Sequence, residues 1–125
     1  MAKNPFNSSK GPKPVGPYSH GAWAGTTFYL SGQIALDKAG NMLQENIALE
    51  TKQVMLNIKS LLEDAGLSMD HIVKCSIFLS DMGLFAEVNE VYKSYFPENP
   101  PARECVAVKG LPKNANVEIS VIAAK

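Results

Sequence analysis

Arginine is almost absent from this chain. Of the 12 cationic side chains, Arg103 alone carries a guanidinium and all the others are lysines. The 12 acidic side chains bring the formal net charge to zero, and no cluster of cationic residues appears along the sequence. A protein whose main partner is DNA or RNA normally presents a basic face. We therefore expect no nucleic-acid partner.

Cysteines and long apolar runs are also scarce. The two cysteines, Cys75 and Cys105, belong neither to a Cys-x-x-Cys pair nor to a Cys/His cluster with metal-ligand spacing. The first residues are polar and include no apolar signal-peptide core, and no apolar run approaches membrane-spanning length. These absences predict a cytoplasmic protein with reduced thiols, no bound metal and no membrane partner.

The length of 125 residues predicts one domain, 1–125. Prolines and glycines punctuate residues 1–16, which indicates an N-terminal arm or loop. Apolar residues then recur at helical spacing from Ile47 to Ala65, with Gly66 as a C-cap. A second helix is expected to begin after Asp81, a good N-cap, and to end at Pro97.

Strands are expected over 21–24, 28–30, 71–80, 102–109 and 116–124. The element order is then β-β-α-β-α-β-β, which predicts an α+β fold with a mixed sheet and both helices on one face. The chain supplies no third helix for the other face of the sheet. Self-association is the natural way to cover that face.

Arg103 stands at the start of an expected strand, just after two prolines. Its planar fork of donors matches a carboxylate in two parallel hydrogen bonds, and a structural ion pair or a solvated strand end is the alternative. Strand alternation puts Cys105 on the same side as Arg103. We expect no covalent catalysis by Cys105, because no histidine or helix N-terminus nearby lowers the pKa of its thiol.

Four further polar residues are candidate site residues with open alternatives. Glu118 faces away from the apolar side of the last strand, so it contacts solvent or, in a cleft, positions or deprotonates water. Asn89 lies near the apolar stripe of the second helix, as a core amide or a substrate contact. The hydroxyls of Tyr18 and Ser31 either bind a ligand or cap a turn.

The motifs that carry a family resemblance run in order along the chain: Gly16-Pro17-Tyr18-Ser19, Leu30-Ser31-Gly32-Gln33-Ile34, Ala65-Gly66-Leu67, Ile72-Val73-Lys74, Phe85-Ala86-Glu87-Val88-Asn89, Pro101-Ala102-Arg103-Glu104-Cys105-Val106, and Leu111-Pro112 followed by Val117-Glu118-Ile119. In their order and spacing they resemble the RidA family, also called YjgF, of enamine/imine deaminases. The resemblance covers about residues 16–124, and the stretch around Arg103 is its most specific element.

The resemblance implies a chorismate-mutase-like fold and a homotrimer whose sheets form a central barrel, with clefts between subunits. It implies hydrolysis of 2-iminopropanoate and 2-iminobutanoate, released by pyridoxal-phosphate dehydratases, to 2-keto acids and ammonia, without a metal or organic cofactor. Arg103 would bind the substrate carboxylate and the backbone at Cys105 would bind the ligand. Glu118 would hold water or assist proton transfer. Tyr18, Ser31 and Asn89 would complete the pocket, some from the adjacent subunit.

Two positions depart from the family pattern: His20 and Ser120 stand where many relatives carry glutamine and glutamate. An imidazole near the cleft would titrate near neutrality; of the two alternatives for His20 we expect the other, a surface imidazole. Two other functions remain open, namely a non-catalytic protein that senses small carboxylates in the same pocket, and a ribonuclease or translation inhibitor. The neutral charge argues against the ribonuclease. A single arginine also argues against a chorismate mutase, whose substrate is a dianion.

Overall fold

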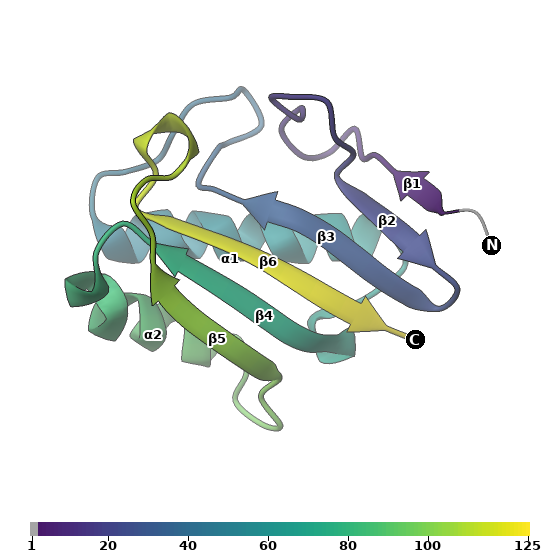
Figure 1. Ribbon diagram of the computed structural model, residues 1–125. Helices are drawn as coiled ribbons and strands as arrows, with labels where there is room; N and C mark the ends of the chain where they lie inside the picture. Colours follow the sequence, from purple (N-terminus) through teal and green to yellow (C-terminus); the bar gives the residue numbers. More distant parts are fainter. Residues whose placement is uncertain (1–2) are drawn as a thin grey trace.

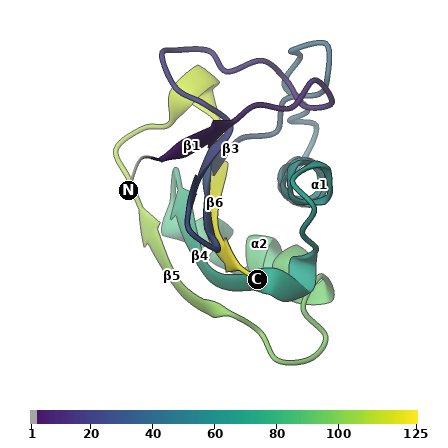
Figure 2. The ribbon, with the colours of Figure 1, turned by 90° about the vertical axis from the view of Figure 1, so that its right-hand side faces the viewer.

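A six-stranded sheet carries two helices on one of its faces (Figures 1 and 2). The computed structural model describes residues 3–125. The strands are β1 (Asn4–Phe6), β2 (Gly21–Ala24), β3 (Thr27–Gln33), β4 (Ile72–Leu79), β5 (Ala102–Ala107) and β6 (Val117–Ala124), and the helices are α1 (Ile47–Asp64) and α2 (Phe85–Ser94). The order across the sheet is β1-β2-β3-β6-β4-β5. Of the strand pairs in the described part of the chain, β4–β5 is parallel and the others are antiparallel, which confirms the expected mixed sheet.

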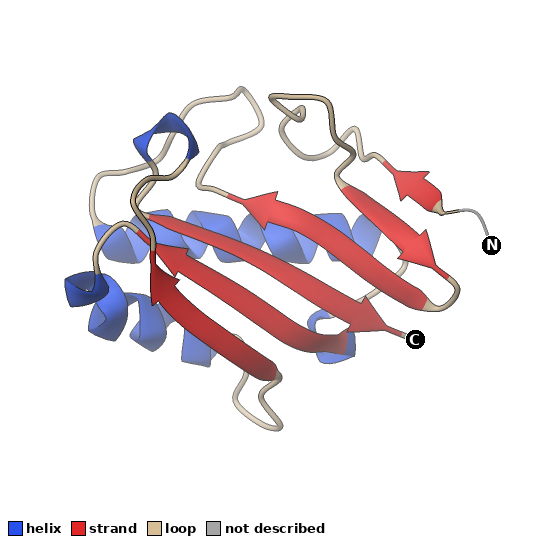
Figure 3. Ribbon diagram, viewed as in Figure 1, coloured by secondary structure: helices blue, strands red, loops and turns tan. Residues whose placement is uncertain are grey.

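The N-terminal arm is not loop throughout, and the expectation for residues 1–16 was wrong at β1. Asn4, Pro5 and Phe6 pair antiparallel with β2 and form one edge of the sheet. Proline is tolerated there because an edge strand leaves one side of its backbone unpaired. The next part of the arm, up to the start of β2, is loop, drawn in tan in Figure 3.

Both helices begin and end close to where the sequence predicts. The side chain of Asn46 caps α1 by accepting a hydrogen bond from the Leu49 amide at 2.9 Å. Gly66 has a φ of 82°, the left-handed conformation that glycine adopts readily after a helix. Asp81 caps a short 3₁₀ turn, Met82–Leu84, which leads directly into α2, so the cap lies one turn earlier than the α-helix itself.

The core lies between the sheet and the two helices. Along β6, alternate residues from Val117 to Ala123 are buried, which is the alternation expected for a strand with one face on the core. They pack against the buried stripe of α1, which includes Val54, Ile58 and Leu61. This packing confirms the predicted apolar face of the last strand.

Within residues 3–125, neither α-helix covers the other face of the sheet (Figure 2). Tyr29 and Val106 have 48% and 44% of their surface exposed there. Large apolar side chains left open on a sheet face usually mark a surface that meets another protein. No helix among residues 3–125 is long and apolar enough to cross a membrane.

Candidate functional site

The residues predicted to form one site lie on two faces of the sheet. In the β4–β5 ladder, Arg103 pairs with Cys75, which is fully buried on the helix side. Glu118 on β6 pairs with Phe78, which lies three residues after Cys75 on β4. Because successive side chains of a strand alternate between the two faces, Phe78 and Glu118 point to the open face. One chain therefore presents two separate groups of candidate residues, which we call the arginine half-site and the glutamate half-site.

The arginine half-site is built on two aromatic rings of α2. The guanidinium carbon of Arg103 lies 4.9 Å from the ring centre of Tyr92 and 5.5 Å from that of Phe85. The side chain is exposed, and no carboxylate among residues 3–125 forms an ion pair with it. The structure therefore excludes one of the alternatives for Arg103, a structural ion pair within residues 3–125. Stacking on the rings holds the guanidinium and leaves its donor edge open.

Asn89 belongs to the same half-site. With Arg103 it lines a hollow of about 280 Å³ between α2 and the start of β5, whose other walls include Phe96 and Pro101. The side chain is partly exposed and therefore is not a core amide. Of the two alternatives for Asn89, this position favours a ligand contact.

Cys105 offers its backbone, not its thiol. Val108 donates its amide hydrogen to the Leu79 carbonyl, and the direction of hydrogen bonding alternates along a strand. The even-numbered residues of β5 therefore bond to β4, and Arg103 and Cys105 turn their backbone groups to the free edge of the sheet. Burial raises the pKa of the Cys105 thiol despite the charge of Arg103 nearby, which agrees with the expectation against covalent catalysis.

The hydroxyl group of Tyr92 is buried without a hydrogen-bond partner among the described residues. The ring of Tyr92 is buried beneath Arg103. Burial raises the pKa of Tyr92, and the adjacent thiol of Cys75 raises it further. The hydroxyl stays protonated, and the ring acts as a platform for the guanidinium. Tyr92 is not among the residues predicted from the sequence to form the site.

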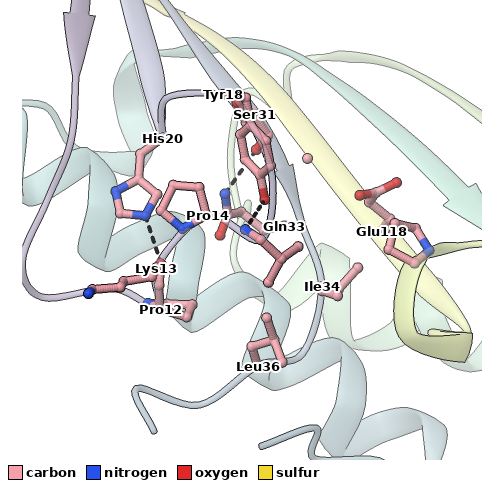
Figure 4. A pocket seen from close by; sticks show the side chains of 13 residues that line it. Pro12, Lys13, Pro14, Tyr18, His20, Ser31, Gln33, Ile34, Leu36 and Glu118 are labelled. Carbon is pink, nitrogen blue, oxygen red and sulfur yellow. Dashed lines mark hydrogen bonds between the residues drawn. The ribbon is translucent and has the colours of Figure 1, made fainter. Parts of the chain in front are cut away.

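The glutamate half-site is a cavity of about 330 Å³ at the end of β3 (Figure 4). The loop of the arm forms one wall, and Glu118 with Pro112 forms another. Tyr18 and Ser31, both predicted from the sequence, line this cavity with Glu118. Three of the six predicted residues thus lie together in one cavity.

The two hydroxyls of this cavity have complementary free groups. The Tyr18 oxygen accepts a hydrogen bond from the Val15 amide at 3.3 Å, which leaves its own hydrogen free to donate. Ser31 donates its hydrogen to the Ser19 carbonyl at 2.7 Å, which leaves its lone pairs free to accept. Both hydroxyls hold the arm in place and both retain one capacity for a ligand.

Glu118 is partly buried and has no cationic partner among residues 3–125. Desolvation by burial raises the pKa of its carboxyl group. Gly32 makes this position possible, because a β-carbon there would lie 2.8 Å from the Glu118 Oε2 atom. Glycine within a strand often marks such a close approach, so the glycine of the Ser31-Gly32-Gln33 segment is a sequence signal for the position of Glu118.

His20 is not a surface imidazole, and that expectation was wrong. Only 4% of its surface is exposed, and it lines the same cavity as Tyr18 and Glu118. The reason is the arm, which folds back over the start of β2 and covers the ring. Nothing in the residues next to His20 signals this burial, because the covering segment lies 8 to 12 positions earlier in the chain.

Comparison with known proteins gives a consistent result. Residues 8–125 match the model of the family described as Endoribonuclease L-PSP. A protein of Pyrococcus abyssi named RutC family protein is 43% identical over 100% of this chain and 99% of its own length. A Bos taurus protein named 2-iminobutanoate/2-iminopropanoate deaminase is 38% identical over 98% of this chain and 90% of its own length.

A solved structure agrees with these relatives. The crystal structure of E. coli TdcF with bound serine superposes with a TM-score of 0.91, at 32% identity, over 98% of both chains. Fold, length and sequence therefore match from the arm to the last strand. The chain belongs to the Endoribonuclease L-PSP family, which is the RidA (YjgF) family that its motifs resemble.

Proposed function

We propose that this protein hydrolyses 2-iminobutanoate and 2-iminopropanoate to the 2-keto acids and ammonia. The observation that carries the proposal is Arg103, whose open fork is held over two aromatic rings with no internal ion pair among the described residues. A small carboxylate fits this fork in two parallel hydrogen bonds. The deaminase name of the bovine relative and the serine bound to TdcF support a small carboxylate ligand.

We propose further that the complete site forms between subunits of a homotrimer. Within one chain, Arg103 and Glu118 lie on opposite faces of the sheet, so no movement of side chains joins the two half-sites. A ring of three copies, with the open sheet faces forming a central barrel, would bring the arginine half-site of one copy to the glutamate half-site of the next. The exposed apolar residues of the open face support this assembly.

The chemistry needs a polarised imine nitrogen and a positioned water. Glu118, whose pKa is raised by burial, holds a proton more readily than an exposed glutamate and donates it to the nitrogen. Water then adds to the protonated imine: the C–O bond forms, the C=N bond becomes single, and a proton of the added water returns to the Glu118 carboxylate. Glu118 passes this proton to the amine nitrogen of the tetrahedral intermediate. The C–N bond then breaks, ammonia leaves, the hydroxyl proton returns to Glu118 and the C=O bond of the 2-keto acid forms. This reaction requires neither a redox step nor a cofactor.

The remaining residues position the substrate in this account. Arg103 binds the carboxylate, and the free backbone groups of Cys105 bind the ligand along the strand edge. Tyr18 donates to, and Ser31 accepts from, the polar groups at the reacting end. Such preorganised contacts lower the barrier by orientation and electrostatics. We place the reaction in the cytoplasm, together with the dehydratases that release these imines.

The test is a coupled assay. A threonine dehydratase generates the imine, semicarbazide competes for it, and release of 2-oxobutanoate is followed with wild-type protein and with Arg103→Ala. We expect faster release with wild type and no enhancement with Arg103→Ala. The matched control is Lys59→Ala, which removes an exposed positive charge from α1 and should behave as wild type.

The two other functions give different results in the same experiment. A carboxylate sensor would bind 2-oxobutanoate through Arg103 and leave the rate of release unchanged. A ribonuclease would cleave RNA, lose activity as salt rises, and keep it in Arg103→Ala. No rate enhancement by folded wild-type protein would contradict the proposed deaminase.

A further inference from the structure

His20 connects the arm to the sheet through side-chain and backbone groups at once. Its amide donates to the Asn7 Oδ1 atom at 3.0 Å, and its carbonyl accepts from the Ser31 amide at 2.8 Å. Its ring nitrogens contact Ser8 and Pro12. One buried residue therefore links the first part of the arm, the loop that lines the cavity, and the strand that carries Ser31.

The hydrogen-bond partners fix the tautomer of the ring. The Ser8 amide can only donate, so Nδ1, at 2.9 Å, accepts from it and carries no hydrogen. Nε2 then carries the hydrogen and donates it to the Pro12 carbonyl at 2.7 Å. The imidazole is neutral in this arrangement, and both of its nitrogens are used in holding the arm.

The bond to Pro12 matters because Pro12 begins the wall of the glutamate half-site. Residues 12–15 line the cavity, and the Val15 amide bonds the Tyr18 hydroxyl. In Figure 4, His20 and Pro12 lie on one side of Ser31 and Gln33, and Glu118 lies on the other. The imidazole thus holds the wall that faces Glu118 across the cavity.

The other contacts of this loop are weaker. Lys10 pairs with Asp64 at 3.5 Å, with 66% of the lysine side chain exposed. Exposed ion pairs of this kind contribute little. A β-carbon at Gly11 would lie 3.1 Å from the Leu61 Cδ2 atom, so this glycine has an apolar neighbour, which gives no directional contact. The hydrogen bonds described for residues 7–14 are one within the loop, from the Lys10 amide to the Ser8 hydroxyl, and three to His20. Of the three, the bond from the ring Nε2 is the one that reaches Pro12.

We propose that His20 is a positioning residue, which fixes residues 12–15 as the wall of the cavity and so sets the space available to the substrate. It does this through the Nε2–Pro12 bond, while the Ser8 bond orients the ring. The part of this inference that concerns the substrate rests on the proposed deaminase function. The part that concerns the arm does not.

Three variants separate the two ring bonds. His20→Ala removes both. In His20→Gln the terminal amide reaches the Nε2 position and can donate to Pro12, whereas in His20→Asn it reaches only the Nδ1 position and can accept from Ser8. Gln and Asn each keep a polar group in the buried site, so the comparison between them stands even where His20→Ala does not fold.

The first readout is independent of activity. Trypsin cleavage after Lys10 reports release of the arm, and cleavage after Lys38, in an exposed turn, is the internal reference. We expect cleavage after Lys10, relative to Lys38, to be about tenfold faster in His20→Ala and His20→Asn than in wild type, and close to wild type in His20→Gln.

The second readout is the imine assay. We expect His20→Ala and His20→Asn to raise KM about tenfold with kcat within a few-fold of wild type, and His20→Gln to restore KM. Equal arm protection in all four proteins, or a His20→Gln variant no better than His20→Ala, would overturn the proposal. If wild-type protein shows no imine hydrolysis, the proposed function fails, and the cleavage pattern alone decides whether His20 fixes the arm.

Discussion

Arg103 and Glu118 lie on opposite faces of one sheet, in the same chain. Arg103 is in register with the buried Cys75 on the helix side, and Glu118 is in register with Phe78 on the open side. Because alternation in a strand fixes the face of each residue, this separation is set by the fold and not by rotamers. A site that needs both residues has to draw them from different copies of the chain.

Replacement of Arg103 by lysine tests the geometry of the fork. Arg103→Lys keeps the positive charge and loses the planar pair of donors and the stacking on Tyr92. We expect kcat/KM for 2-iminobutanoate to fall by roughly a hundredfold, the loss that a charged bidentate contact of about 3 kcal/mol implies. Activity in Arg103→Lys equal to wild type would show that charge alone is sufficient.

Gly32 is predicted to position Glu118. In Gly32→Ala the new methyl group meets the Glu118 carboxylate at 2.8 Å, so that side chain must move while the backbone remains. We expect kcat to fall about tenfold with the fold intact, because a proton donor acts only when it is aligned with the reacting atom. Gly110→Ala is the matched control, since a methyl group there has nothing within 4 Å. Equal loss in both variants would remove the special role of Gly32.

The ionised carboxylate of Glu118 is also predicted to lower the stability of the folded protein at neutral pH. Its pKa is raised in the folded state, so the folded protein binds this proton more tightly than the unfolded chain. The stabilising contribution of the proton is complete below the ordinary glutamate pKa of about 4.3, and it is lost as the pH rises through the raised value. We therefore expect Glu118→Gln to be more stable than wild type at pH 7.5.

Urea unfolding at two pH values checks this prediction. The advantage of Glu118→Gln over wild type should shrink between pH 7.5 and pH 4, because both proteins are then neutral at this position. Glu98→Gln, in an exposed loop, serves as the control and should show no such dependence. A wild type more stable than Glu118→Gln at pH 7.5 would mean that the carboxylate finds a favourable partner in the assembled protein.

Tyr92 gives a prediction that separates stability from activity. Tyr92→Phe removes a buried hydroxyl that has no partner among residues 3–125 and keeps the ring beneath Arg103. An unsatisfied buried polar group costs on the order of 1 kcal/mol or more. We expect the free energy of unfolding to rise by about that amount and kcat/KM to stay unchanged. A clear loss of stability would show that the hydroxyl bonds the Cys75 thiol.

Much of the fold follows from local patterns in the sequence. The spacing of apolar residues and the caps Asp81 and Gly66 predict both helices, and alternation predicts the buried face of β6. β1 was missed because Asn4-Pro5-Phe6 has no strand pattern of its own and is held by pairing with β2. Pairing between distant segments is a tertiary effect that propensity does not contain.

Some features of the candidate site also follow from local patterns in the sequence, and others depend on tertiary structure. Alternation placed Arg103 and Cys105 on one side of their strand, and their register with Cys75 and Ile77 confirms this. Glu118 lies on the other face of the sheet. That face could not be predicted, because it depends on the order of the strands in the sheet, and alternation within one strand gives no information about that order. His20 was misjudged for a similar reason, since its burial depends on an arm that folds back over it.

Each site is predicted to combine Arg103 of one subunit with Glu118 of another, and a mixture of two inactive variants tests this pairing. Arg103→Ala and Glu118→Gln proteins are unfolded together, refolded at equal amounts and assayed for imine hydrolysis. In a ring of three with random assembly, roughly one quarter of the sites receive both native residues. We predict recovery of about that share of wild-type activity, whereas a mixture as inactive as its two components would contradict the account.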